Sequence, residues 1–474
     1  MPPSAGPLGI RLRKRLRRFQ VKRLLVFQKT SRDKIRRLVS IMLPIVVTQL
    51  AIMGMNFFDV SMAGQAGNAD LAGVAVSGNL WVPVQTGISG VLLAAMPLVA
   101  NFLGAGAKES IKQVMRQGLI LALFFTVVVL LALWLYVPGL IAAMGLEAEV
   151  YHIAVGYMGG VGLGVLPFFL MTPLRSLVDT LGYTRLTMKI YLLALPINAL
   201  LNYALIFGRL GLPRLGGVGA GVATGLTCWI LFLLFAFVVA RLEPFKSYRV
   251  FTPARPSFKW LREYLRLGLP MGCAIVMETG IMCVVAVLIA PFGTEALAAH
   301  QAAMNFAGLI YMIPLSFSMA LTIVVGIEYG AQNYAGAKAY ARLGVQLSVL
   351  LAFTYMLLEI SFREQIARIY SEDAAVVAMI KSFLVYAICW QAGDTVGVPL
   401  QGILRGYKDV KATFWTGMLA YWGVCLPVGL LLDRLAGNGP FSYWQSFIAG
   451  VAVTAVVLGL RLRFLEQKLR GNLI

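Results

Sequence analysis

Two acidic residues stand alone inside long apolar stretches. Glu278 lies in AIVMETGIMC and Asp394 in CWQAGDTVGV, and neither has another charged residue within one helical turn in sequence. If these stretches cross a membrane, inserting each charge near the bilayer centre costs about 2.5–3.5 kcal/mol of free energy. A charged residue at this depth therefore indicates a functional or structural role. A carboxyl group there can take up and release a proton near neutral pH, or hold Na⁺ with neighbouring oxygens. The alternative is a protonated acid that hydrogen-bonds two helices together.

A third acid, Asp59 in MNFFDVSMAG, lies toward the outer end of the first predicted helix, where solvation alone could explain it. Asn198 and Asn202 are spaced i and i+4 on another predicted helix and therefore share one face. They could hydrogen-bond the Asp59 carboxyl, or they could only join two helices. Arg175 and Asp179 have the same spacing and are expected to pair.

Methionine and aromatic side chains accompany these acids. The candidates for the lining of an adaptable apolar cavity are Met53, Met55, Met277, Met282, Met304, Phe306 and Trp390. Methionine is flexible and polarisable, so it suits a cavity that takes different ligands. Plain core packing or contact with lipid is the alternative for each of them.

The amino-acid composition indicates the environment that surrounds these residues. Of 474 residues, 59% are hydrophobic and 13% are charged, whereas soluble domains are about 45–50% apolar and about 25% charged. Such a chain needs lipid as its solvent. The net charge of +21 could suggest nucleic acid, but the Lys and Arg residues lie between apolar runs. We therefore expect a bilayer, and no nucleic acid, as the partner.

Twelve apolar runs are separated by short polar breaks. Runs of about 20 residues can span a bilayer about 30 Å thick. We predict an all-α membrane protein with transmembrane helices over 38–62, 71–103, 117–137, 150–181, 187–207, 217–240, 263–291, 297–329, 341–361, 375–404, 411–432 and 442–464. Three charged residues near the ends of these runs, Glu328, Glu359 and Lys381, are expected to reach polar surroundings.

The distribution of Lys and Arg predicts the orientation. With the N-terminus inside, the cytoplasmic segments hold 34 of these residues and the outer loops hold five. The positive-inside rule then places both termini in the cytoplasm of a multi-pass inner (plasma) membrane protein.

The two halves of the chain are repeats. A shift of 226 residues places Pro44 on Pro270 and Pro173 on Pro399, and the motif AGAK at 105–108 recurs at 335–338. Because each unit has six helices, both halves begin on the same side of the membrane. We expect two homologous six-helix bundles, related by a pseudo-two-fold axis along the membrane normal, with a substrate cavity where they meet.

These repeats predict five segments. Residues 1–37 form a basic extension with thirteen Lys or Arg residues, 38–240 an N-lobe, 241–262 a cytoplasmic linker, 263–464 a C-lobe and 465–474 a cytoplasmic tail. The extension could lie as a helix on anionic lipid or remain a disordered tail.

Several motifs are absent from the sequence. It has no GxxxxGK[ST], GxSxG or HExxH motif, and its five cysteines form no CxxC pair. We therefore predict no ATPase, hydrolase or histidine metal site, and no enzyme activity. The energy for any transport must come from an ion gradient or from a partner, and we expect no cofactor.

Five segments resemble a known family: NFFDVSMAG (56–64), PINALLNYALIFG (196–208), LGLPMGCAIVMETG (267–280), AAHQAAMNF (298–306) and QAGDTVGVPLQGILRGYKD (391–409). Together they resemble the multidrug and toxic compound extrusion family, in its bacterial branch nearest to the norfloxacin exporters. The match covers nearly all of residues 38–464.

The resemblance implies an antiporter that expels cationic amphipathic drugs in exchange for Na⁺ or H⁺. We expect the protein to be a monomer. It assigns ion coupling and substrate binding to Asp59, Asn198 and Asn202 in the N-lobe and to Glu278 and Asp394 in the C-lobe. Some relatives carry a Tyr where this chain has Trp390. Tryptophan offers no oxygen to Na⁺, which favours H⁺.

Three alternatives differ in their chemistry. A lipid-linked oligosaccharide flippase of the same superfamily would need cationic residues in its cavity to hold pyrophosphate. A membrane-embedded transferase would need clustered catalytic acids or a metal near an interface. A channel would need a pore-loop motif. The acids of this sequence favour the exporter.

Overall fold

The computed structural model describes residues 30–253 and 255–471. The described residues form no strand, and twelve of their helical spans are long and apolar enough to cross a membrane. Every predicted run coincides with one of these spans, which confirms the all-α class. Helices are favoured because a backbone in lipid must satisfy its hydrogen bonds within its own segment.

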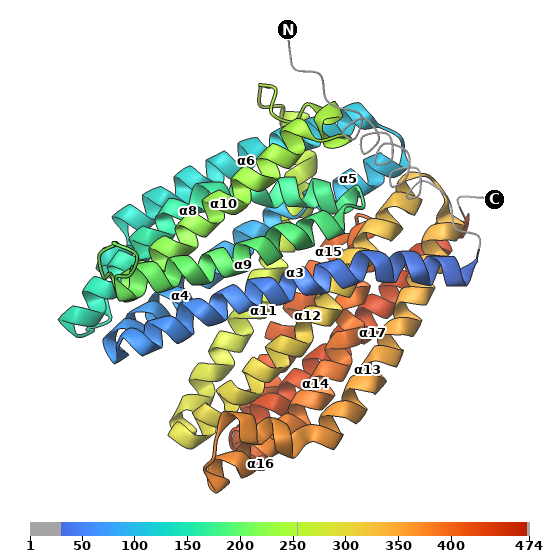
Figure 1. Cartoon of the computed structure of the whole chain (residues 1–474). Coiled ribbons are helices and arrows are strands. Elements are labelled where there is room, and N and C mark those ends of the chain that lie inside the picture. Colours follow the sequence, from blue (N-terminus) through green and yellow to red (C-terminus); the bar gives the residue numbers. More distant parts are fainter. Residues whose placement is uncertain (1–29, 254, 472–474) are drawn as a thin grey trace. The chain divides into compact units, whose positions relative to one another are not determined.

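Seven helices form the first six spans, and the short helix α7 lies between the third and the fourth span (Figure 1). Their bounds are α3 Ser31–Ala66, α4 Asn68–Leu92, α5 Ala95–Gly104, α6 Lys108–Leu135, α7 Val137–Ala143, α8 Ala148–Thr180, α9 Thr184–Phe207 and α10 Gly217–Arg241. The second span combines α4 and α5.

The last six spans repeat this arrangement. Their helices are α11 Phe258–Ile289, α12 Thr294–Gly330, α13 Tyr334–Tyr370, α14 Ala374–Gly406, α15 Val410–Gly417, α16 Leu426–Ala436 and α17 Phe441–Gly471. A π-helical segment, Met418–Cys425, joins α15 to α16 in the eleventh span.

The helices form two compact units. The first unit contains Leu43–Gly268, and the second combines Thr30–Met42 with the chain from Leu269 onward. The two internal boundaries, after Met42 and after Gly268, are 226 residues apart (268 minus 42). This separation equals the offset of the sequence repeat, so both halves divide at the same repeat position.

The units differ from the predicted lobes at the beginning of α3 and α11. Residues 38–42 belong to the second unit and residues 263–268 to the first. Contacts inside each unit explain this. In the second unit, Arg37 lies 3.7 Å from Glu328 and over the Tyr340 ring, and in the first unit the Tyr264 hydroxyl donates a 2.5 Å hydrogen bond to the Leu92 carbonyl.

Two of the three charged residues expected to reach polar surroundings are buried. Glu328 is 1% exposed and accepts a 2.7 Å hydrogen bond from the Asn333 side chain, in addition to its contact with Arg37. Glu359 is 5% exposed. Lys381 instead forms a 3.3 Å ion pair with Glu364. Glu328 thus finds its polar surroundings inside the second unit, because Arg37 of α3 lies beside it. The expectation was wrong for Glu359, whose buried carboxyl oxygens have no hydrogen-bond partner among the described residues.

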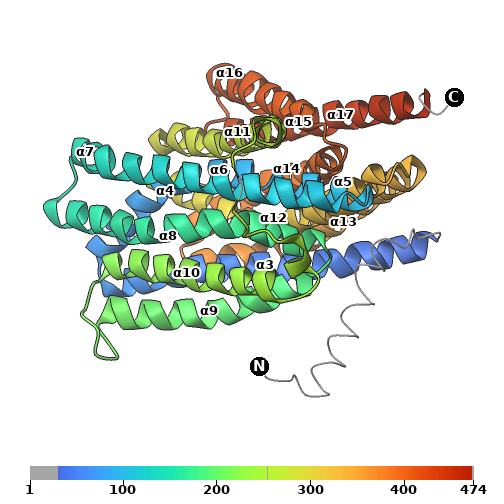
Figure 2. The same cartoon turned by 90° about the horizontal axis from the view of Figure 1, so that it is seen from above.

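Within the first unit, α6, α8, α10 and α9 lie side by side in that order (Figure 2). Small residues let α8 and α10 approach closely: a Cβ atom on Gly164 would lie 2.8 Å from the Cα atom of Gly225. In the second unit, α12, α14 and α17 are neighbours, and the Ser318 hydroxyl of α12 donates to the Val398 carbonyl of α14 at 2.8 Å. Small residues and interhelical hydrogen bonds are the usual means of packing helices in lipid.

Gly160→Val should destabilise the protein, because the glycine is buried where a Cβ atom would lie 2.5 Å from the backbone nitrogen of Val222. Overpacking of this kind costs about 1–3 kcal/mol. The matched control is Gly159→Val, since the adjacent glycine is exposed and has no atom within 4 Å of such a Cβ. The thermal midpoint of detergent-purified protein should fall for the first variant only. Equal midpoints would contradict the close α8–α10 contact.

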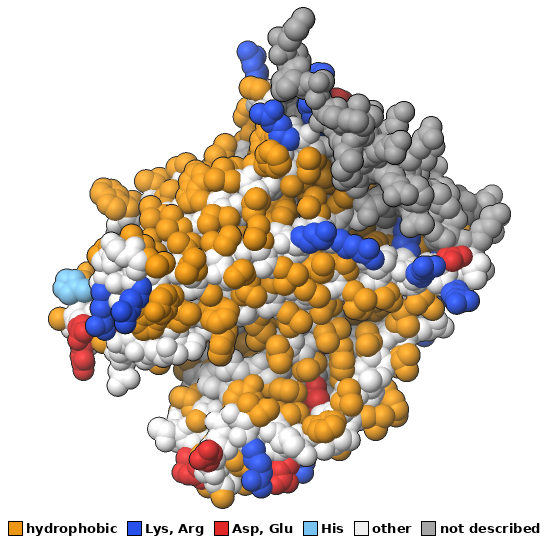
Figure 3. All heavy atoms as spheres, viewed as in Figure 1, with side chains coloured by type: hydrophobic (Ala, Val, Ile, Leu, Met, Phe, Trp, Pro, Cys, Tyr) orange, Lys and Arg blue, Asp and Glu red, His pale blue; other side chains and the backbone are white. Residues whose placement is uncertain are grey.

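Hydrophobic side chains cover most of the face drawn in Figure 3. Exposed side chains include Phe124, Val127 and Leu131 on α6 and Leu350, Phe353 and Leu357 on α13. A soluble protein rarely exposes contiguous apolar patches of this extent. These surfaces are suited to lipid.

Candidate functional site

In the first unit, Asp59 of α3 is held by polar side chains from α9 and α10. The Asn202 and Asn198 side-chain amides donate to Asp59 Oδ1 at 2.5 and 3.3 Å, and the Thr224 hydroxyl donates to Oδ2 at 2.8 Å. The carboxyl-bearing residue is only 6% exposed. The predicted hydrogen bonds from the two asparagines are therefore present, and simple solvation does not explain this acid.

The pair of asparagines is itself connected. Asn202 Nδ2 also lies 3.2 Å from Asn198 Oδ1, and Asn198 Nδ2 lies 3.4 Å from the Thr227 hydroxyl. Both asparagines are at most 1% exposed. The i,i+4 spacing on α9 aims both amides at one carboxyl group, as a shared helix face requires.

Asp59 faces a cavity of about 220 Å³ inside the first unit. The cavity combines apolar walls with a few polar groups, which is typical of a small-molecule site. Residues that line it include Met55, Asp59, Gln85, Phe168, Arg175 and Asn198.

Arg175 brings a positive charge to the same cavity. Its guanidinium lies 3.4 Å from the Asp179 carboxylate, as the i,i+4 spacing predicts, and donates a 3.0 Å hydrogen bond to Gln49. It also lies 5.0 Å from the centre of the Tyr191 ring. Asp179 balances the charge of Arg175, so the cavity keeps the Asp59 carboxylate as its uncompensated charge.

In the second unit, Glu278 of α11 and Asp394 of α14 lie close enough to interact electrostatically. Asp394 is 6% exposed and Glu278 is partly buried. The fold therefore joins two acids that are 116 residues apart in sequence (394 minus 278). Two neighbouring carboxyl groups compete to be charged, so a cation or proton is favoured between them.

Three residues that sequence reasoning missed join this acid pair. The Tyr311 and Tyr421 phenols lie within electrostatic range of both acids, and Arg405, in the last turn of α14, lies within range of Glu278. Arg405 also donates a 3.0 Å hydrogen bond to Gln401. Both acids are alone in sequence, but in space Glu278 has a cationic neighbour.

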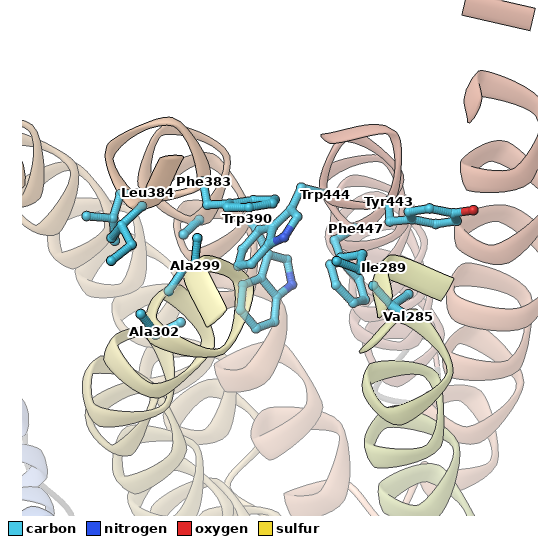
Figure 4. Close-up of a cluster of buried hydrophobic side chains, with 14 of the residues drawn as sticks. Val285, Ile289, Ala299, Ala302, Phe383, Leu384, Trp390, Tyr443, Trp444 and Phe447 are labelled. Carbon is cyan, nitrogen blue, oxygen red and sulfur yellow. The ribbon is translucent and has the colours of Figure 1, made fainter. Parts of the chain in front are cut away.

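Trp390 lies in a hydrophobic cluster of the second unit and not in a described cavity (Figure 4). Its ring stacks on Phe447 with centroids 5.5 Å apart and meets Trp444 edge-on at 6.0 Å. The residue is 5% exposed. A role for it in cargo binding stays a prediction, and the phenols of Tyr311 and Tyr421 supply oxygens near the acids that the indole lacks.

The methionine candidates have different positions. Met304 packs against the same cluster, and the Met277 carbonyl accepts a 3.2 Å hydrogen bond from the Trp422 indole. Met53 is half-buried, whereas Met55, two residues later, lines the cavity of the first unit. Of the predicted cavity methionines, Met55 therefore does line a cavity.

The histidines and cysteines form no metal site among residues 30–253 and 255–471. His300 is 1% exposed, and its Nδ1 accepts a 3.1 Å hydrogen bond from the Trp444 indole. All five cysteines are free thiols. Oxygen atoms of the acids and phenols thus remain the groups available for a small cation.

Comparison with known proteins identifies the family. The MatE family model matches residues 44–204 and 270–431, one match in each repeat. A probable multidrug resistance protein NorM of Oceanobacillus iheyensis is 43% identical over 440 residues, which cover 93% of this chain and 98% of that protein. The Geobacillus kaustophilus protein of the same description is 46% identical over 431 residues, which cover 91% of this chain and 95% of that protein.

Solved structures share the fold. An outward-facing multidrug resistance MATE family transporter of the MOP superfamily superposes with a TM-score of 0.86 at 19% identity, covering 96% of this chain and 99% of that chain. A eukaryotic MATE transporter superposes with a TM-score of 0.83 at 19% identity, and the match covers 93% of this chain and 99% of that chain. Matches in both repeats, and relatives aligned over nearly their whole length, agree with this architecture. The chain is therefore a NorM-like member of the MATE family of multidrug efflux transporters, and not an enzyme.

Proposed function

We propose that the protein exports cationic amphipathic drugs in exchange for H⁺ or Na⁺ by alternating access. The observation that supports this most directly is the cavity in the first unit, in which apolar walls surround the Asp59 carboxylate. Acids with apolar walls attract amphipathic cations and reject anions. The description of the relatives as probable multidrug resistance proteins agrees with such cargo.

Coupling requires that ion and drug compete for the same charge. We assign this competition to Asp59 in the first unit and to the Glu278–Asp394 pair in the second. A bound drug cation lowers the affinity of a nearby carboxylate for a proton or Na⁺, and linkage makes the effect reciprocal. The coupling ion needs no cofactor, and a monomer suffices because each unit carries its own acid site.

The pairing of Arg175 with Asp179 argues against a flippase for pyrophosphate-linked lipids. A flippase cavity needs a free cation for the phosphates, whereas this guanidinium already contacts Asp179, Gln49 and Tyr191.

Transport in proteoliposomes tests the proposed function. We expect an imposed H⁺ or Na⁺ gradient to drive ethidium uphill, and we expect no comparable movement of an anionic dye of similar size. Each gradient is applied alone, so the driving ion is identified directly. Uphill transport of the anion, or no response to either gradient, would refute the exchange of cations.

The orientation proposed for the inner membrane places both termini and the 241–262 linker in the cytoplasm. A cysteine introduced at Lys246, between α10 and α11, should resist a membrane-impermeant thiol reagent in intact cells. One introduced at Glu147, between α7 and α8, should react. The native cysteines are first replaced by serine. The opposite labelling pattern would reverse the topology.

A further inference from the structure

A second cavity, of about 510 Å³, lies at the beginning of α13 within the second unit. It is separate from both acid sites. Among the residues that line it are Ser31, Tyr334, Lys338, Arg342, Tyr407 and Glu466. They come from the beginning of α3, from α13, from the turn after α14 and from α17.

The charges of this cavity favour an anion. Lys338 Nζ lies 3.1 Å from a Glu466 carboxylate oxygen, so these two charges balance each other. Arg342 is exposed and forms no ion pair with a residue that the structure describes. One guanidinium therefore remains available to a ligand, and guanidinium groups bind phosphate oxygens well.

Tyrosine hydroxyls add neutral donors. Tyr334 and Tyr407 both line the cavity, and the Tyr329 ring contacts both of their rings, with centroids 5.8 and 5.3 Å apart. Burial, together with the nearby Glu466, raises the pKa of Tyr407 above its ordinary value. The Tyr407 phenol thus keeps its proton and can donate a hydrogen bond to an anion.

The outer surface of α13 continues from this cavity as an apolar stripe. Beyond Arg342 and Gln346, the exposed apolar side chains Leu350, Phe353, Leu357 and Ile360 recur every three or four residues, and the exposed Val349 lies next to Leu350. Residues with this spacing lie on one face of a helix. Residues 343–358 contain no charged side chain, so Arg342 marks the boundary between headgroups and hydrocarbon.

We propose that this cavity binds the phosphate headgroup of an anionic phospholipid, whose acyl chains lie along the apolar stripe of α13. Arg342 contacts the phosphate, Tyr407 donates a hydrogen bond to it, and the stripe from Val349 to Ile360 covers one chain. Basic pockets between spanning helices suit anionic headgroups. The site lies in the leaflet that faces the N-terminus, and it does not depend on which drug or ion is transported.

Native mass spectrometry of the full-length protein tests the site. Detergent-solubilised protein is mixed with dioleoyl phosphatidylglycerol, dioleoyl phosphatidylcholine or glycerol phosphate, and the bound adduct is counted. We expect phosphatidylglycerol to be retained over phosphatidylcholine. Arg342→Gln should lower its retention about fivefold, as expected for one basic residue at an anionic lipid surface. The control is Arg363→Gln, near the other end of α13.

A second variant shifts binding in the opposite direction. Glu466→Gln releases Lys338 from its ion pair, so retention of phosphatidylglycerol should rise. A fold defect cannot produce this gain. The proposal is overturned if the two lipids bind equally, if Arg342→Gln and Arg363→Gln have the same effect, or if Glu466→Gln does not increase binding. Retention of glycerol phosphate as strong as that of the lipid would assign the cavity to a free anion and would equally overturn the lipid site.

Discussion

Glu278→Gln should abolish gradient-driven efflux while leaving the protein inserted and folded. Glutamine keeps the shape of the side chain and removes its charge, so the site can no longer exchange a cation for a proton or Na⁺. Coupling free energies between ligands are about 1–3 kcal/mol, or about 5- to 150-fold in affinity. Loss of this coupling should therefore reduce ethidium efflux from loaded vesicles to the rate of empty ones. Asp394→Asn should behave in the same way, because the two acids interact.

The matched control for this change is Glu295→Gln, which alters an exposed glutamate in the first turn of α12. Size-exclusion chromatography and thermal unfolding establish that all three variants are folded. Removal of a charge from the membrane interior should leave insertion intact or improve it, since an isolated buried charge is costly. If both acid variants export ethidium at the wild-type rate, coupling does not reside in the second unit.

Asp59→Asn should weaken drug binding by at least about tenfold, the size expected when a hydrogen-bonded charged partner is lost. The carboxylate is the uncompensated charge of the first cavity, and its three donors, Asn198, Asn202 and Thr224, hold it in place. Ethidium fluorescence polarisation with purified protein measures the dissociation constant. Thr224→Val, which removes one donor and keeps the charge, should have a smaller effect.

Asp33→Asn provides the control, since Asp33 is an exposed acid on the same helix, α3. If Asp59→Asn binds ethidium as tightly as Asp33→Asn does, the first cavity does not recognise cations through this carboxylate. If Asp59→Asn binds normally but fails to transport, Asp59 acts in coupling and not in recognition.

The twelve helices could be predicted because length and hydropathy decide them in a lipid environment. The repeat could also be predicted, since Pro44 and Pro270 mark equivalent positions in α3 and α11. The sequence could not predict to which compact unit the first turns of α3 and α11 belong. This membership depends on contacts such as Tyr264 with Leu92, which lie 172 residues apart and leave no local pattern.

The sites show the same difference. Asn198 and Asn202 were recognisable because their spacing places them on one helix face, although the sequence could not show that Asp59 would lie opposite. Tyr311 and Tyr421 gave no signal, because tyrosine is common in apolar runs. Arg405 follows the predicted run 375–404, and the observed span Ala374–Gly406 includes it.

Ion release on drug binding tests the central claim most directly, because it measures the proposed competition without transport. Purified protein in weakly buffered detergent solution receives ethidium while a pH-sensitive dye reports protons and an electrode reports Na⁺. The wild type should release one of these ions in proportion to bound drug. Glu278→Gln and Asp394→Asn should bind ethidium with little or no release. Wild-type release by both variants would contradict coupling at the Glu278–Asp394 pair and would make Asp59 the leading candidate.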